Sequence, residues 1–252
     1  LCAVIGALLI LLTQKGDFSL PAAGWGICLV AGVAIGVNYI VWVLALKSGV
    51  YLFASAANSA GFIVAVLCGL LFFEEQLTLL KGLAIVLILV AMLFMGRYQK
   101  DTGGKTKPVH LLLLFLVFLS GGISSVTQKW FTRTLPEVSA HSYTFYSLAI
   151  SVALLLIFTF FLPKRPPAQA RVKSVKGLLP WIAVMAGCFY GVTYFQTGAS
   201  AMLDAVVMYP VYNGALLAAG SIMAWVCFSE KPNRNSIIGV LLVFAAVVLA
   251  GL

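Results

Sequence analysis

The sequence predicts an all-α fold, a polytopic bundle of transmembrane helices. Charged residues make up only 9% of the chain and hydrophobic residues 62%, whereas a soluble domain carries about 25% charged residues. The apolar residues also gather in runs of roughly 20, long enough to cross a hydrocarbon core of about 30 Å. These runs are uniformly apolar, unlike the alternating strands of a membrane barrel, so each is expected to be a helix.

The runs follow one another along the chain, and charged or turn-forming residues separate them. Leu1–Leu12 is a partial run, and a basic linker over residues 98–108 divides the rest into two groups. The full spans are predicted at Gly24–Leu46, Val50–Phe73, Leu79–Gly96, Val109–Phe131, Ser142–Leu162, Leu178–Ala201, Ala205–Phe228 and Ser236–Leu252.

The two groups of spans are related by an internal repeat without gaps. Asn58 and Asn213 stand 155 residues apart (213 minus 58), and at that offset Glu75 matches Glu230 and Tyr39 matches Tyr194. Residues 1–97 and 109–252 are therefore predicted to be two copies of one unit.

The repeat also predicts the topology. The second copy begins near Pro108. Subtracting the offset of 155 places the start of the first copy at position −47, so the first copy is expected to begin about 48 residues before Leu1. Each copy then has five spans, and an odd number places the copies in opposite orientation, an inverted repeat. Gly32 and Gly36 recur as Gly187 and Gly191, and glycines four apart are expected to let helices approach closely in both copies.

Several segments resemble the drug/metabolite transporter superfamily, in particular its ten-span EamA-type members. They are Phe72-Phe73-Glu74-Glu75-Gln76-Leu77-Thr78, Phe228-Ser229-Glu230-Lys231-Pro232, and Tyr209-Pro210-Val211-Tyr212-Asn213. The resemblance implies a central substrate cavity and alternating access without ATP. The first copy has Ser55 where the second has Pro210, so a helix break at this point is expected on one side only.

Polar residues inside the spans are the candidate solute-binding residues, because polar groups in lipid must find partners or line water. Helix–helix hydrogen bonding is the alternative, and for Asn58 and Asn213 the two interpretations are equally open. Tyr143 and Tyr146 are expected in the interfacial aromatic belt. The candidates are Asn38, Tyr39, Ser55, Asn58, Gln128, Thr193, Tyr194, Gln196, Tyr209, Tyr212 and Asn213.

The charged residues are expected at the membrane edges. Glu75 and Glu230 each end an apolar run, and we expect them to start the next helix, where a carboxylate suits the positive N-terminal end. Lys129 and Arg133 are assigned to a loop. No carboxylate falls in mid-span, so carboxylate-based proton coupling is not expected. The net charge of +9 lies in short loops, which favours a membrane surface over nucleic acid.

Together these patterns predict a multi-pass protein of the cell membrane. The favoured function is secondary transport of a small organic solute, with export the commoner direction. The alternatives are a membrane scaffold or receptor without transport activity and, less favoured, an integral-membrane enzyme; no nucleophile–base pair or metal-ligand spacing supports catalysis. The expected partners are the solute and the lipid bilayer. A homodimer is left open, and no cofactor, metal or nucleic acid is expected.

Overall fold

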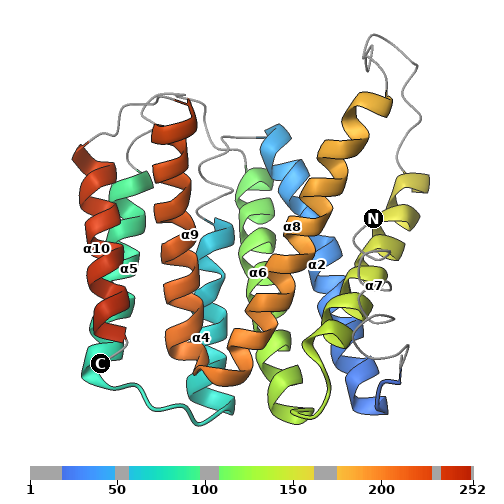
Figure 1. Cartoon of the computed structure of the whole chain (residues 1–252), viewed down its shortest axis with the longest axis horizontal. Helices are drawn as coiled ribbons and strands as arrows, with labels where there is room; N and C mark the ends of the chain where they lie inside the picture. The colour runs from blue at the N-terminus through green and yellow to red at the C-terminus, as the bar shows by residue number, and fades with distance from the viewer. Residues whose placement is uncertain (1–18, 49–56, 97–107, 162–174, 229–233, 251–252) are drawn as a thin grey trace. The chain divides into compact units, whose positions relative to one another are not determined.

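Helices account for all the regular structure that the computed structural model describes, over residues 19–48, 57–96, 108–161, 175–228 and 234–250; no strand occurs in these ranges. The helices are α2 (Ala22–Ser48), α4 (Phe62–Phe72), α5 (Leu79–Gly96), α6 (Pro108–Thr134), α7 (Ala140–Phe161), α8 (Val175–Met202), α9 (Ala205–Phe228) and α10 (Arg234–Ala250) (Figure 1).

The predicted spans within these ranges are confirmed as helices, and the bounds of α5 and α9 match the prediction at both ends. The apolar runs are a reliable guide because a helix satisfies its own backbone whatever lies around it. Leu1–Leu12 and the linker as far as residue 107 lie outside the described residues.

Within the described ranges, three helices are long and apolar enough to cross a membrane: Ala22–Leu46, Leu111–Thr134 and Ala140–Phe160. Large apolar side chains are exposed on the helix surfaces, for example Phe160 (87% exposed) and Phe195 (73% exposed). Exposed apolar surface on this scale is unusual on a soluble monomer and suits a lipid environment. The ten-span count and the inverted repeat remain predictions.

The chain divides into two compact units, and each takes residues from both sides of the linker. Unit 1 comprises residues 1–40 and 127–202, and unit 2 comprises residues 41–126 and 203–252. The helices α2 and α6 therefore contribute one end to each unit.

The core of unit 1 forms where α2, α6 and α7 meet. Cys28 and Ala31 of α2 are fully buried against Phe131 of α6 and Tyr143 of α7. The ring centroids of Phe131 and Tyr143 are 5.0 Å apart, a favourable aromatic separation.

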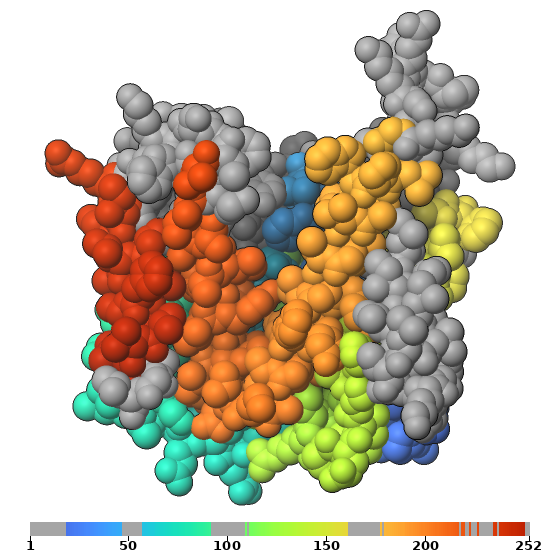
Figure 2. All heavy atoms as spheres, in the orientation of Figure 1, coloured from blue at the N-terminus to red at the C-terminus, as the bar shows by residue number. Residues whose placement is uncertain are grey.

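The core of unit 2 forms where α5, α9 and α10 pack side by side (Figure 1). Its buried centre is Ala91 of α5, Ala218 of α9 and Val243 of α10, and small residues here let the helices approach closely. The helices α9 and α10 are in contact, and Figure 2 shows their described side chains, orange and red, on one face of the molecule.

The helix of unit 2 that contains Asn58 is interrupted, but the one that contains Pro210 is not. Residues 57–60 are helical, Gly61 forms a turn, and α4 begins at Phe62. The α9 helix continues through Pro210, which lies in its second turn and removes one donor to the carbonyl four residues earlier. A one-sided break was expected from Pro210, but the interruption lies in the other copy. At this point the chain packs closely on α6, since a Cβ at Gly61 would lie 3.0 Å from the backbone N of Gly122.

The two predicted glycine pairs differ in their surroundings, which corrects the expectation of equal packing. A Cβ at Gly32 would lie 2.6 Å from Ile150 Cβ, and one at Gly36 would lie 2.7 Å from Leu154. At Gly187 and Gly191 no described atom lies within 4 Å of such a Cβ. The repeat in sequence therefore does not produce a repeat in packing at these positions.

The expectation of an interfacial belt is wrong for Tyr143. Its side chain is fully buried, and its hydroxyl lies 3.1 Å from Thr127 Oγ1 on α6. Tyr146 is also buried and packs on Trp25, with ring centroids 4.7 Å apart. Both rings point into unit 1, which the sequence alone does not reveal.

Candidate functional site

The predicted solute-binding residues fall into two groups, one in each unit. Ser55 lies outside the described residues. The group in unit 1 is Asn38, Tyr39, Gln128, Thr193, Tyr194 and Gln196, and the group in unit 2 is Asn58, Tyr209, Tyr212 and Asn213.

An amide pair joins α6 to α8 in unit 1. The Nε2 of Gln128 donates to Oε1 of Gln196 over 3.5 Å. The Gln128 side chain is only 3% exposed, and its Oε1 is buried without a hydrogen-bond partner among the described residues. Leaving a buried acceptor unsatisfied costs about 1–3 kcal/mol, so this oxygen calls for an explanation.

The missing partner does not depend on how the amide is oriented. The O and N of a side-chain amide are assigned from their surroundings. Turning both glutamines over would place an N–H₂ of Gln128 where its oxygen now lies. One end of the amide is bonded to Gln196 and the other is unpartnered in either orientation.

Two further side-chain contacts join α6 to α8 at the C-terminal end of α8. Lys129 Nζ donates to the backbone O of Ser200 over 3.1 Å, and Thr132 Oγ1 lies 3.4 Å from Ser200 Oγ. The ammonium suits the negative end of α8. Lys129 was assigned to a loop, but it lies within α6 and is buried, so it is not a free surface charge for setting the orientation in the membrane.

An aromatic group surrounds His141 at the start of α7. Its Nδ1 lies 3.1 Å from the hydroxyl of Tyr190, and its ring stacks on Tyr194 with centroids 4.1 Å apart. One residue before Tyr190 on α8, Phe189 is contacted edge-on by Tyr39 of α2, with ring centroids 5.6 Å apart. Tyr39 and Tyr194 both pack against the buried cluster that contains Tyr190, and their contact with a solute remains a prediction.

In unit 2, Tyr209 and Asn213 each bond to a backbone carbonyl. The hydroxyl of Tyr209, which is fully buried, donates to the O of Ser125 on α6 over 2.6 Å. Asn213 Nδ2 donates to the O of Tyr209, one turn back on α9, over 2.9 Å. These bonds give both residues a structural role, and their contact with a solute remains a prediction.

Tyr209→Phe is expected to lower the free energy of unfolding by about 1 kcal/mol, because it removes one hydrogen bond and leaves the carbonyl of Ser125 without that donor. Thermal unfolding in detergent measures the change. The matched control is Tyr212→Phe, the same substitution one residue before Asn213, at a side chain that is only half-buried. A Tyr209→Phe protein as stable as the wild type would show that this bond contributes nothing.

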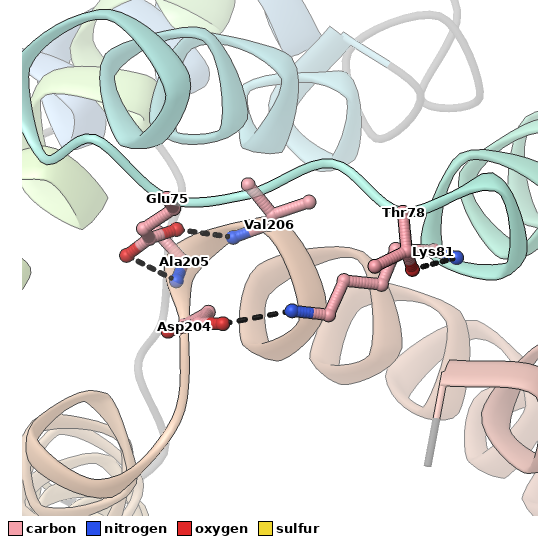
Figure 3. Close-up of polar contacts among 6 residues, drawn as sticks. All are labelled: Glu75, Thr78, Lys81, Asp204, Ala205 and Val206. Carbon is pink, nitrogen blue, oxygen red and sulfur yellow. Dashed lines mark hydrogen bonds and ion pairs between the residues drawn. The ribbon is translucent and has the colours of Figure 1, made fainter. Parts of the chain in front are cut away.

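Glu75 holds the start of α9, a contact that the local sequence does not reveal. Its Oε1 and Oε2 accept the backbone N–H groups of Ala205 and Val206 over 2.9 and 3.0 Å (Figure 3). Glu75 therefore meets a helix N-terminus, as expected, but the helix is α9 and not α5, the next helix in the chain. At the start of α5, Thr78 Oγ1 accepts the backbone N–H of Lys81 instead.

An ion pair lies beside this contact, and it occupies the carboxylate that would otherwise be expected to cap α9. Asp204 precedes α9, where an Asp side chain usually caps the helix itself. Instead its Oδ2 binds Lys81 Nζ over 2.8 Å (Figure 3), and Glu75 supplies the cap. We call Glu75, Lys81 and Asp204 the α9 clamp.

The acidic residues of the described ranges lie outside the helices, as the sequence predicts: Glu74, Glu75, Glu137 and Asp204. Glu230 lies outside these ranges. Within them no three metal-ligating side chains come together.

The architecture is that of an all-helical protein with helices suited to a membrane, and it recurs among solved structures. No family model matches the sequence, and no curated protein matches it. Twenty-eight chains of solved structures resemble it. One, a crystal structure described only as that of a protein, superposes with a TM-score of 0.74 at 16% identity, over 98% of this chain and 82% of its own. At this identity the likeness shows the fold alone.

Proposed function

We propose that this protein is a secondary transporter of the drug/metabolite type. It carries a small polar organic solute across the membrane by alternating access, with export as the direction. The observation that supports this proposal best is the buried, half-satisfied amide of Gln128, which lies in the apolar helix Leu111–Thr134. A buried polar atom without a partner costs about 1–3 kcal/mol, so its presence in an apolar helix supports a functional role.

The α9 clamp supports the mechanical part of the proposal. Alternating access requires helices that move together as rigid bodies. Glu75 accepts two hydrogen bonds from the start of α9, and Lys81 forms one ion pair with Asp204. These contacts tie the connection between α4 and α5 to the start of α9. Because of these ties, the α4–α5 connection and α9 are expected to move as one body.

A membrane scaffold without transport activity is the second candidate. The observation that favours it is that Tyr209 and Asn213 each donate a hydrogen bond to a backbone carbonyl within unit 2. A protein that only packs its helices would do the same.

Transport by the whole chain in liposomes tests the proposal. The assay follows uptake of a panel of amino acids, sugars and other neutral metabolites, with protein-free liposomes as background. We expect at least one solute to be carried, and both Asn58→Ala and Asn213→Ala to lower its rate by about tenfold, which corresponds to about 1.4 kcal/mol of lost interaction.

The matched control is Asn235→Ala, the same change at the second residue of α10 and outside the predicted site. It is expected to carry the solute at the wild-type rate. If both Asn variants also do so, the site assignment is wrong. If the wild type carries no solute of the panel, the scaffold is the better description.

A further inference from the structure

The hydroxyl groups of α8 on either side of Gln196 offer acceptors, because their protons are already used. On α8, Thr193 Oγ1 donates to the O of Phe189, and Thr197 Oγ1 donates to the O of Thr193. Ser200 Oγ donates to the O of Thr197 over 2.7 Å. A hydroxyl has one proton and two lone pairs, so each of these groups can still accept a bond but has no proton left to donate.

The same pattern holds on α6. Thr132 Oγ1 donates to the backbone O of Gln128 or of Lys129, over 3.2 and 3.1 Å. The ammonium of Lys129 is directed to Ser200 O, and the Nε2 of Gln128 is directed to Gln196. The hydroxyl protons of Thr132 and of the three α8 residues are therefore used within their own helices. Among the described residues, the Oε1 of Gln128 is left as a buried acceptor without a donor.

We propose that the Oε1 of Gln128, the unpartnered atom in the orientation that the structure gives this amide, accepts a hydrogen bond from an N–H or O–H group of the carried solute. This inference rests on the proposed function and narrows it. The solute is a neutral or cationic molecule with at least one such donor, and a molecule whose donors are all methylated is rejected. A site built to bond a donor discriminates strongly against an analogue that lacks it, because the buried acceptor is then left unpaired.

Donor-methylated pairs of small molecules test this inference without the natural solute. The probes are pentanamide with N,N-dimethylpentanamide, and cyclohexanol with methoxycyclohexane. Each is added at rising concentration to the purified chain in detergent, and thermal unfolding is followed. Binding to the folded state raises Tm. We expect the donor-bearing member of at least one pair to raise Tm by about 2–4 °C and its methylated partner to have no effect.

Gln128→Met removes the acceptor and keeps the length of the side chain. The variant is expected to fold with a Tm close to that of the wild type, because removal of the unpaired buried oxygen offsets the loss of the bond to Gln196. It is also expected to lose the rise in Tm that the donor-bearing probe causes. Gln128→Leu, a second apolar replacement, must also lose the rise in Tm that the donor-bearing probe causes. The control is Gln76→Met, the same change at an exposed residue of the α4–α5 connection, which must keep the shift.

Three results would overturn the inference: no shift with either donor-bearing probe, equal shifts for both members of a pair, or a full shift in Gln128→Met. A water molecule held permanently at Gln128 would give the first or the last of these. Transport separates this inference from the proposed function. If Gln128→Met carries solute with an unchanged KM, Gln128 does not bind the solute, and the proposed transport function stands. If the donor-bearing probes raise Tm but no solute is carried, the proposed transport function is wrong.

Discussion

Glu75→Ala is expected to lower the free energy of unfolding by about 2–4 kcal/mol, the largest effect of any single change considered. It removes both acceptors from the first two N–H groups of α9. Hydrogen bonds to a charged group contribute about 1.5–3 kcal/mol each, and the carboxylate also meets the positive end of the α9 dipole. The two bonds share one side chain, so their contributions do not add fully.

The backbone around Glu75 is arranged for this contact. Gly69 O accepts the N–H of Glu75 over 3.1 Å, and Glu74 adopts a φ of 54°, the left-handed conformation in which helices often end. A Cβ at Gly69 would lie 2.7 Å from Glu75 Oε2 and 3.3 Å from Ala205 Cβ. A side chain at Gly69 would therefore displace the carboxylate from α9.

The change in Tm in detergent measures the effect, and Glu75→Gln separates charge from hydrogen bonding. The amide keeps one acceptor but places an N–H₂ group against the other backbone N–H, so its Tm is expected between those of wild type and Glu75→Ala. Glu74→Ala is the matched control, since Glu74 is exposed and adjacent. A Glu75→Ala protein with the Tm of Glu74→Ala would show that the clamp does not hold α9.

The sequence predicts helices well here and their partners poorly. The bounds of α5 and α9 follow from apolar runs that end at charged or turn-forming residues, which are local features. Glu75 and Ala205 are 130 residues apart, and no local pattern joins them. The repeat places Glu75 at the end of an apolar run, but only packing decides that it caps α9.

The candidate site shows the same limit. The sequence places Gln128 and Gln196 inside apolar runs, and the structure brings them together. The sequence also places Tyr143 at the start of an apolar run, which suggests the membrane interface, yet this ring is buried in the core of unit 1. Position along a span gives depth in the membrane, whereas the direction of a side chain depends on which neighbours cover the helix.

Gly32→Ala is expected to destabilise the protein by about 1–3 kcal/mol, the cost of overpacking a filled interface. The new methyl group would lie 2.6 Å from Ile150 Cβ and 2.7 Å from the backbone O of Ser147. A flexible side-chain tip could turn away, but a Cβ atom and a helix carbonyl move only if α2 and α7 separate. That separation would weaken the packing of the adjoining Ala31, which is fully buried.

Gly187→Ala is the matched control, because the repeat makes it the equivalent position on α8. No described atom lies within 4 Å of a Cβ there, so alanine is expected to stabilise the helix by up to about 1 kcal/mol. The two variants should therefore shift Tm in opposite directions, by about 2–4 °C for each kcal/mol. Equal losses would mean that Gly187 is packed as closely as Gly32, as the repeat alone predicts, while equal gains would mean that the contact between α2 and α7 at Gly32 is loose.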